Sequence, residues 1–369
     1  MRQKPKYMEI YDQLKAQICG GELRPGERIY SENELMQMFS VSRQTVRQSL
    51  ARLEAEGLAV RKRGSGTYVR EQSGRRDPSV RSRQIAVVTT YIDEYIFPKI
   101  IKSIEETICG SGYTIQVAFT HNSVETERRI LRKLADENIV SGLIIESTKS
   151  ALPNPNIELY RELMEKGVPV LFLNSYYPQL SVPHVSMDDR QAGKMAAQFL
   201  IKKGHRQIGA VFKADDGQGH LRYKGYMEAL LEAGLDIPED SILWVTTGDM
   251  EEMCCEKSRY LKMLRTVTAC VCYNDTVASR LMEICEAEGI GIPGELSLIG
   301  IDDADTSRDL PVPLTTIHNP LHRLGRLSGE LMLKMIQGQK VPRENELAGI
   351  LIERDSVAGG TESPQKEED

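Results

Sequence analysis

No run of about 18 consecutive apolar residues, the minimum for a membrane-spanning helix, occurs in this chain of 369 residues. The first residues, MRQKPKYMEIYDQLKAQI, also lack the apolar centre of a secretory signal peptide. Both absences predict a cytoplasmic protein with no membrane segment.

The cysteines lack the patterns of metal and redox sites. They form no CxxC pair and no Cys/His cluster with metal-ligand spacing. Cys270 and Cys272 lie in an apolar, strand-like run, where thiols usually pack as small hydrophobic groups. We therefore expect structural thiols, no bound metal and no cofactor. The seven cysteines are Cys19, Cys109, Cys254, Cys255, Cys270, Cys272 and Cys285.

Motifs of common enzyme active sites are missing as well. The sequence contains no P-loop, no HExxH and no GxSxG. No spacing pairs two carboxylates as a general acid and base. We therefore expect a binding protein and not an enzyme, although turnover of a pentose by the purified chain would favour the enzyme alternative.

Charge is distributed unevenly along the chain, whose formal net charge is −6. Residues 1–84 carry 17 lysines and arginines against 10 acidic residues, whereas the remainder carries 30 against 43. A basic N-terminal segment joined to an acidic body is typical of a DNA-binding module attached to another domain. This basic segment and the missing signal peptide also argue against a transport-type binding protein.

Residues 28–69 have the pattern of a winged helix-turn-helix. Ser31 and Glu34 form a capping box before the apolar residues Leu35, Met38 and Phe39. Ser42 can cap a second helix whose inward face is Val46, Leu50 and Leu53, and Gly57 ends that helix. Two short strands around Gly64-Ser65-Gly66 then predict the wing.

The outward residues of the second helix have side chains that can reach base edges and phosphates in a major groove. They are Arg43, Gln44, Thr45 and Arg47. The run PGERIYSENEL…FSVSRQTVRQSL…EGL…RGSGTYV resembles the DNA-binding domain of the GntR family of bacterial regulators over roughly residues 4–70. The resemblance implies base contacts from this helix, a wing in the adjacent minor groove or on its backbone, and phosphate contacts from Lys4, Lys6 and Arg63. The full set of expected DNA-contacting residues is Lys4, Lys6, Ser31, Glu32, Ser42, Arg43, Gln44, Thr45, Arg47, Arg63, Gly64, Ser65, Gly66 and Thr67.

The rest of the chain predicts an α/β fold. Polar residues 71–84, interrupted by Pro78, indicate a linker after the 1–70 domain. Buried-strand runs then alternate with amphipathic helical segments, a pattern that predicts parallel sheets covered on both faces in two doubly wound subdomains. We expect this domain to span 85–358 and a disordered tail to occupy 359–369.

Ligands of such sheets bind at the carboxyl ends of the strands. Polar or aromatic residues follow the expected strands at 91–97, Glu146, Asn174, Asn274–Asp275 and Asp302. These groups suit a small, polyhydroxylated, largely uncharged ligand. Each of these residues also has a structural alternative when it is taken alone. Asp302 and Asp303 could be helix caps, and Glu146 could form an ion pair with Lys99. Arg222, which the next resemblance adds to the site, could be a surface residue of an amphipathic helix.

Several motifs in this region together resemble the ligand-binding domain of the LacI/GalR repressors, from about 85 to 356. They are VSMDDRQAGKMAAQFLIKKGHRQIG, RYKGYMEAL, YNDTVA, GIPGELSLIGIDD and PLTTIHNP. The resemblance implies a two-lobed, Rossmann-like fold of the periplasmic-binding-protein type, with three crossover strands between the lobes. It also implies that Arg222, Asn274 and Asp302 hold sugar hydroxyls.

The fusion of these two domains resembles a family of arabinose-responsive repressors, through the segments 91–106, 142–156 and 215–226. That resemblance implies L-arabinose as effector and a dimer on a near-palindromic operator DNA. It adds Lys99, Glu146 and Phe97 to the sugar site, and Asn319 stands where relatives carry Gln or His. The full set of expected effector-binding residues is Tyr91, Phe97, Lys99, Glu146, Arg222, Asn274, Asp302 and Asn319. A different pentose or an oligosaccharide is the alternative effector, because such residues specify hydroxyl chemistry better than stereochemistry.

Overall fold

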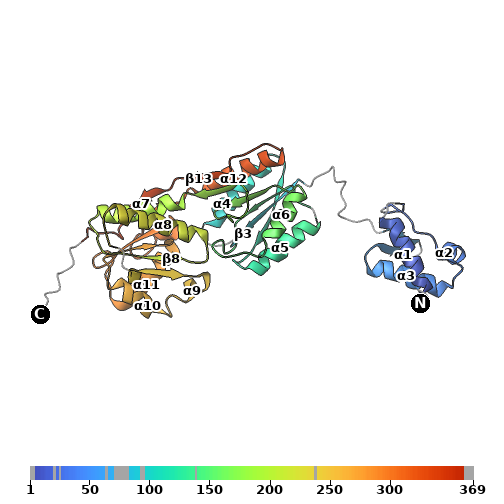
Figure 1. Cartoon of the computed structure of the whole chain (residues 1–369), viewed down its shortest axis with the longest axis horizontal. Coiled ribbons are helices and arrows are strands. Elements are labelled where there is room, and N and C mark those ends of the chain that lie inside the picture. Colours follow the sequence, from blue (N-terminus) through green and yellow to red (C-terminus); the bar gives the residue numbers. More distant parts are fainter. Residues whose placement is uncertain are drawn as a thin grey trace. The chain divides into compact units, whose positions relative to one another are not determined.

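The computed structural model describes residues 5–19, 22–24, 26–62, 65–69, 83–91, 96–137, 139–236 and 239–360. The chain divides into two compact units, Met1–Val80 and Arg81–Asp369, here called the head and the body (Figure 1). In the part of the chain just delimited, every helix is too short or too polar to cross a membrane.

The head is a winged helix-turn-helix, as the sequence predicts. Its elements are α1 (Lys6–Cys19), α2 (Glu32–Phe39), α3 (Arg43–Ala55), β1 (Ala59–Lys62) and β2 (Gly66–Val69). The two strands pair antiparallel, with Ala59 opposite Val69. The three helices and the hairpin enclose one apolar core around Ile10, Leu14, Leu35, Val46 and Leu53.

Local sequence explains how the head helices begin. Ser31 and Glu34 form the expected capping box, in which each side chain bonds the other's backbone N–H. The Ser42 hydroxyl accepts the N–H of Thr45 at the start of α3. The spacing of Leu35, Met38 and Phe39 predicts one inward stripe, but Met38 is 53% exposed, and Met36 packs on the core instead. The inward stripe of α2 runs along Leu35, Met36 and Phe39, so Met38 lies outside it.

The first lobe of the body is a six-stranded parallel sheet in the order β13-β7-β6-β5-β3-β4. Helices α5 and α6 pack on one face of this sheet, and α4 and α12 pack on the other. The strands are β3 (Gln84–Thr89), β4 (Thr114–Phe119), β5 (Gly142–Ile145), β6 (Val170–Leu173), β7 (His184–Met187) and β13 (Glu344–Leu347). The helices are α4 (Phe97–Cys109), α5 (Val124–Glu137), α6 (Ile157–Glu165) and α12 (Leu321–Ile336).

The second lobe has the sheet order β14-β12-β11-β10-β8-β9, in which only β14 is antiparallel to its neighbour. Helices α7 and α8 cover one face, and α10 and α11 cover the other. The strands are β8 (Ile208–Lys213), β9 (Ile242–Val245), β10 (Ala269–Cys272), β11 (Ser297–Asp302), β12 (Thr315–His318) and β14 (Ile350–Ile352). The helices are α7 (Asp189–Lys202), α8 (Gly217–Glu232), α9 (Thr247–Glu252), α10 (Lys257–Leu264) and α11 (Asp275–Glu288), with short 3₁₀ turns at Glu239–Ser241 and Asp305–Arg308.

The chain crosses between the lobes three times, as the LacI/GalR resemblance implies. The crossovers follow β7, β12 and β13. They lie side by side, because β12 pairs with β14 and the N–H of Asp188 donates to the carbonyl of Leu347 at 2.9 Å. The carboxyl ends of both parallel sheets therefore face one interlobe space.

Some expected boundaries differ from the observed ones. The amphipathic pattern of residues 252–264 predicts a single helix, but α9 ends at Glu252 and α10 begins at Lys257. Gln84, placed in the linker, begins β3, and Gly360, placed in the tail, donates its N–H to the carbonyl of Lys203. The rest of the expected linker up to residue 82, and residues 361–369, lie outside the described residues.

Candidate functional site

The exposed face of α3 carries the side chains expected to reach DNA. Arg43 and Arg47 are both more than half exposed, and Gln44 is exposed between them. Val46, Leu50 and Leu53 hold the opposite face of the helix in the core. The first turn of α3 therefore presents a basic and amide surface of the kind that enters a major groove.

Glu32, the first residue of α2, forms ion pairs with three arginines of this face. Its carboxylate accepts Nε of Arg47 at 3.0 Å and Nη2 of Arg61 at 3.0 Å, and Nε of Arg43 lies 3.8 Å away. The Arg47 hydrogen bond is the main cause that lowers the pKa of Glu32. Arg43 also donates to Oδ1 of Asn33 at 2.9 Å. Glu32 therefore orients the cationic side chains from α3 and β1.

The remaining expected DNA contacts fall into separate groups. Ser31 and Ser42 are occupied as helix caps, Lys6 begins α1, and Ser65 and Gly66 lie at the wing. Thr67 is a correction: it is 8% exposed, because alternate residues of β2 face the core. Lys4, Arg63 and Gly64 lie outside the described residues. Sequence reasoning missed Arg61 and Lys62, which are exposed on β1.

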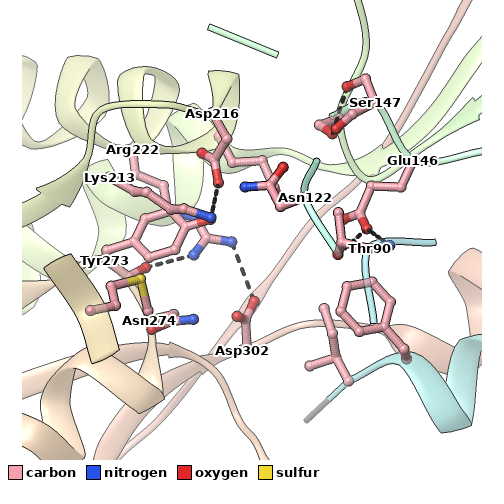
Figure 2. A pocket seen from close by; sticks show the side chains of 15 residues that line it. Thr90, Asn122, Glu146, Ser147, Lys213, Asp216, Arg222, Tyr273, Asn274 and Asp302 are labelled. Atoms are coloured by element: carbon pink, nitrogen blue, oxygen red, sulfur yellow. Dashed lines mark hydrogen bonds and ion pairs between the residues drawn. The ribbon is translucent and has the colours of Figure 1, made fainter. Parts of the chain in front are cut away.

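In the body, a cavity opens between the two lobes at the carboxyl ends of their strands (Figure 2). The space between its walls, which includes open solvent, amounts to about 590 Å³. The lining residues are Thr90, Ile96, Phe97, Asn122, Glu146, Ser147, Ser175, Lys213, Asp216, Gln218, Arg222, Met250, Tyr273, Asn274 and Asp302.

Arg222 is the central donor of the second-lobe wall. Its guanidinium is 1% exposed and donates to Oδ1 of Asp189 at 2.8 Å, to the carbonyl of Tyr273 at 2.6 Å and to Oδ1 of Asp302 at 3.3 Å. Burial alone would lower its pKa, but Asp302 and Asp189 raise it well above the ordinary value. The guanidinium is therefore a fixed, permanently charged fork beside the cavity.

Two glycines allow α8, which carries Arg222, and α7, which carries Asp189, to approach closely. A Cβ on Gly193 of α7 would lie 2.0 Å from the carbonyl oxygen of Arg222, and one on Gly225 of α8 would lie 1.8 Å from that of Arg190. Because no side chain fits there, α7 and α8 pack backbone to backbone. This contact places Asp189 next to Arg222.

Asp302 occupies a turn that ordinary residues rarely adopt. Asp302, the last residue of β11, has φ 115°, and Asp303, directly after the strand, has φ 52°. The carboxylate of Asp302 accepts Arg222 on one side and Nδ2 of Asn319 at 3.1 Å on another. Asn274 caps α11 through Oδ1, which accepts the N–H of Val277, and its amide nitrogen points into the cavity in Figure 2.

A second cation, Lys213, stands at the end of β8. Its side chain is 13% exposed, and Nζ lies 3.3 Å from Oδ2 of Asp216 (Figure 2). Burial would lower its pKa, but Asp216 and Asp215 raise it above the ordinary value. The hydroxyl of Tyr273 donates to the same Asp216 oxygen at 2.6 Å. Both cavity cations are therefore paired with carboxylates.

Glu146 forms the opposite, first-lobe wall. Its Oε2 accepts the backbone N–H of Thr90 at 2.9 Å and the Thr90 hydroxyl at 2.6 Å, and Asn174 donates to Oε1 at 3.4 Å. Burial raises the pKa of Glu146 in spite of these bonds. Ser147 and Ser175 share a hydrogen bond of 2.7 Å beside it. This wall presents carboxyl and hydroxyl groups to the cavity.

Five of the eight expected effector residues line the cavity, namely Phe97, Glu146, Arg222, Asn274 and Asp302. Tyr91 packs on the Phe97 ring at 6.4 Å between centroids, and Asn319 lies behind Asp302. Lys99 is not among the cavity-lining residues: two positions after Phe97 it faces another side of α4, and it pairs with Asp305 at 2.5 Å. Residues 92–95 of the expected 91–97 segment lie outside the described part of the chain.

The structure also decides the alternatives left open by the sequence. Arg222 is buried, not on the surface, and Lys99 pairs with Asp305, not with Glu146. Neither Asp302 nor Asp303 caps the turn that follows, whose cap residue is Ala304. Sequence reasoning missed Lys213, Asp216 and Tyr273, although the first two follow a predicted strand and the strand-end rule could have found them.

A winged-helix head and a two-lobed body with a polar interlobe cavity are the parts of a ligand-responsive transcription regulator. Residues 6–69 match the family model of bacterial regulatory proteins of the gntR family, and residues 197–357 match that of the periplasmic binding protein-like domain. The arabinose metabolism transcriptional repressor of Geobacillus stearothermophilus is 36% identical over 93% of this chain and 94% of its own length. The chain belongs to the family of arabinose metabolism transcriptional repressors.

Solved structures agree with this fold. The regulator CcpA of Lactococcus lactis has a TM-score of 0.67 at 22% identity and covers 75% of this chain and 100% of its own. A LacI-type regulator from Alkaliphilus metalliredigens, complexed with D-xylulofuranose, has a TM-score of 0.64 at 26% identity and covers 75% of this chain and 99% of its own. A CelR–cellobiose complex has a TM-score of 0.67 at 23% identity and covers 86% of this chain and 91% of its own.

Proposed function

We propose that this repressor binds operator DNA as a homodimer in the cytoplasm and is released when L-arabinose binds the interlobe cavity. The head supplies base contacts from Arg43, Gln44 and Arg47, while the wing and neighbouring basic residues contact the backbone. Two heads matched to two half-sites explain the expected near-palindromic operator.

The observation that carries the effector proposal is the array of Arg222, Asp302 and Asn274 facing Glu146 across the cavity. The array combines donors and acceptors, as neighbouring hydroxyl groups require. Phe97, 7% exposed, supplies an apolar surface for the C–H face of a sugar ring. These side chains suit a neutral polyol held from both lobes.

Charge in the cavity favours a neutral sugar over a sugar phosphate or a sugar acid. The two cations, Arg222 and Lys213, are paired with Asp302 and Asp216, and Glu146 adds another carboxyl group. An anionic ligand would have to displace one of these pairs or approach the carboxylates. Because such a displacement leaves a buried carboxylate unpaired, it is strongly unfavourable.

A different sugar is the main rival effector. Relatives with this fold have been solved with D-xylulofuranose and with cellobiose. The name of the Geobacillus stearothermophilus repressor, which is 36% identical to this chain, supports arabinose. Hydroxyl-pairing residues leave the stereochemistry open, so the choice among pentoses needs direct measurement.

Calorimetric titration of the full chain with L-arabinose, beside D-xylose, D-galactose and D-ribose, tests the effector. We expect saturable, selective binding of L-arabinose that is lost in Asp302→Asn. Asp309→Asn, the same change at an exposed position of the following turn, is the matched control and should bind as the wild type does. Binding of another sugar in place of L-arabinose would overturn the effector assignment and keep the regulator.

Operator release is tested next. The operator is selected from random DNA with the purified protein, and its affinity is measured with and without saturating sugar. We expect a decrease of roughly 5- to 150-fold in operator affinity, the usual range for allosteric coupling. An unchanged affinity would contradict release by this sugar. Sedimentation of the protein–operator complex then tests whether two chains bind.

A further inference from the structure

Asp303, next to the cavity residue Asp302, does not face the cavity. It is buried, with 4% of its side chain exposed, and its carboxylate holds three basic side chains. Oδ1 accepts Nη2 of Arg354, Oδ2 lies 2.9 Å from Nδ1 of His318, and Arg308 lies 3.8 Å from Oδ2. Burial would raise the pKa of Asp303, but Arg354 and His318 hold it below the ordinary value.

The partners of Asp303 lie next to the crossovers between the lobes. His318 ends β12, immediately before the crossover at 319–320 that leads to α12. Arg354 follows β14, the strand that begins directly after the crossover at 348–349. His318 and Ile350 are register partners in these two strands. One carboxylate therefore bonds the last residue of β12 and a residue two positions beyond the end of β14.

Arg354 also bonds the segment that leads into β12. Its Nη1 donates to the carbonyl of Leu314 at 2.6 Å and to the hydroxyl of Ser307 at 3.2 Å. Its backbone N–H donates to Oγ1 of Thr315 at 2.9 Å. The arginine is 12% exposed, so these bonds are largely shielded from water.

Hydrogen bonds to Thr316 and Asp275 hold the turn at Asp302 and Asp303 in place. The N–H of Asp303 donates to Oγ1 of Thr316 at 3.3 Å, and the N–H of Ala304 donates to Oδ2 of Asp275 at 2.8 Å. Oγ1 of Thr316 in turn donates to Oδ1 of Asp275 at 2.6 Å. Two consecutive non-glycine residues at positive φ persist only where the surroundings hold them. The turn directs Asp302 toward Arg222 and Asp303 toward His318 and Arg354.

We propose that Asp303 is a positioning residue that couples the sugar cavity to the two C-terminal crossover strands through His318 and Arg354. The proposal rests on the function proposed above, since it describes how occupancy of that cavity reaches the interlobe crossovers. A ligand that moves Asp302 moves Asp303 with it, because the two residues share one constrained turn. The crossovers then respond through the bonds to His318 and Arg354.

The test compares Asp303→Asn with Asp309→Asn in the full chain. Asp303→Asn keeps the shape of the side chain and removes the charge that binds Arg354. We expect its operator affinity without sugar to stay within about twofold of the wild type, while the ratio of operator affinities without and with saturating sugar falls several-fold, toward 1. A merely structural role would lower thermal stability and leave this ratio unchanged, and that result would overturn the proposal.

His318 provides a second, milder pair of variants, because its side chain is 42% exposed. His318→Phe removes the bond to Asp303, whereas His318→Asn keeps a donor near the position of Nδ1. We expect the release ratio to fall in His318→Phe and to be restored in His318→Asn. Equal ratios in both variants would overturn the coupling even if Asp303→Asn failed to fold.

Wild-type behaviour separates the two proposals. If the wild type binds no sugar of the panel, the proposed effector function fails, and amide hydrogen exchange then tests Asp303 directly. We expect faster exchange at 316–321 and 350–354 in His318→Phe than in His318→Asn. Indistinguishable exchange rates in the two His318 variants would overturn the coupling role. If sugar releases the wild type and the variants from the operator equally well, only the role of Asp303 is overturned.

Discussion

The guanidinium of Arg222 lies 3.3 Å from the carboxylate of Asp302, and both side chains are almost completely buried. The two residues come from different elements, α8 and the end of β11, 80 positions apart in the chain. A buried pair of this kind contributes little to net stability, but losing one partner leaves a buried charge. Its position at the cavity wall makes recognition of a ligand its most direct use.

Replacing Arg222 with Met should abolish sugar binding and strongly destabilise the body. The change leaves Asp189 and Asp302 buried without their cation, which costs about 3–5 kcal/mol. Urea unfolding and calorimetry measure the two effects. Arg190→Met is the control, since Arg190 of α7 is half exposed and paired with Glu228, a contact worth less than about 1 kcal/mol. Similar losses in both variants would contradict the central role of Arg222.

Gly225→Ala should separate α7 from α8. The added Cβ would lie 1.8 Å from the carbonyl oxygen of Arg190, so one helix must shift, at about 1–3 kcal/mol or more. Because Arg222 lies one turn earlier on α8, sugar affinity should fall as well. Gly248→Ala is the matched control: its Cβ would meet nothing closer than 3.9 Å. Retained stability and affinity in Gly225→Ala would refute the close-packing argument.

Arg43→Ala should weaken operator binding by on the order of 1–3 kcal/mol and relax base preference. Arg43 is exposed at the start of α3, where side chains reach base edges. Binding to the operator and to random DNA is measured at one salt concentration. An equal loss on both DNAs would assign Arg43 to the backbone instead.

Glu32→Gln tests whether Glu32 orients the DNA-facing arginines. The change removes the carboxylate that holds Arg47 and Arg61 and one negative charge from the face. We expect random DNA to bind slightly more tightly. The ratio of the affinity for operator DNA to that for random DNA should fall several-fold, which corresponds to a loss of about 1 kcal/mol in discrimination. Glu34→Gln, which alters the neighbouring cap instead, serves for comparison. An unchanged ratio in Glu32→Gln would contradict the orienting role.

Asp275 should make the body less stable as the pH rises. Burial raises the pKa of Asp275 to about 8, whereas an unfolded aspartate titrates near about 3.9. Between these values the folded protein binds more protons than the unfolded chain, so the free energy of unfolding falls with increasing pH. The slope is at most about 1.4 kcal/mol per pH unit and disappears above the folded pKa.

Asp275→Asn should remove this dependence. Urea unfolding of both proteins at several values from about pH 5 to pH 8 measures the slope. Asp189, whose pKa burial raises to about 6, keeps its own smaller contribution at the acidic end of the range in both proteins. Parallel stability curves for the variant and the wild type would refute a protonated Asp275.

The local patterns of the sequence were sufficient for the elements of the fold. Capping at Ser31 and Ser42 and the apolar spacing of α3 predicted the head, and alternating strands and helices predicted the parallel sheets. The pattern failed where two helices follow each other, at 252–264, because the turn between them has no glycine or proline. It also failed for Met38, because a short helix permits more than one inward stripe.

By itself, then, the sequence determined a basic winged-helix head, a two-lobed α/β body and the strand ends at which ligands bind. These features follow from local periodicity, capping and charge, which can be read within a few turns of chain. Only the tertiary structure decided that Arg222 meets Asp302, that Lys213 joins the cavity and that Lys99 pairs with Asp305. Those contacts depend on how closely distant elements pack, and no local spacing in the chain encodes that distance.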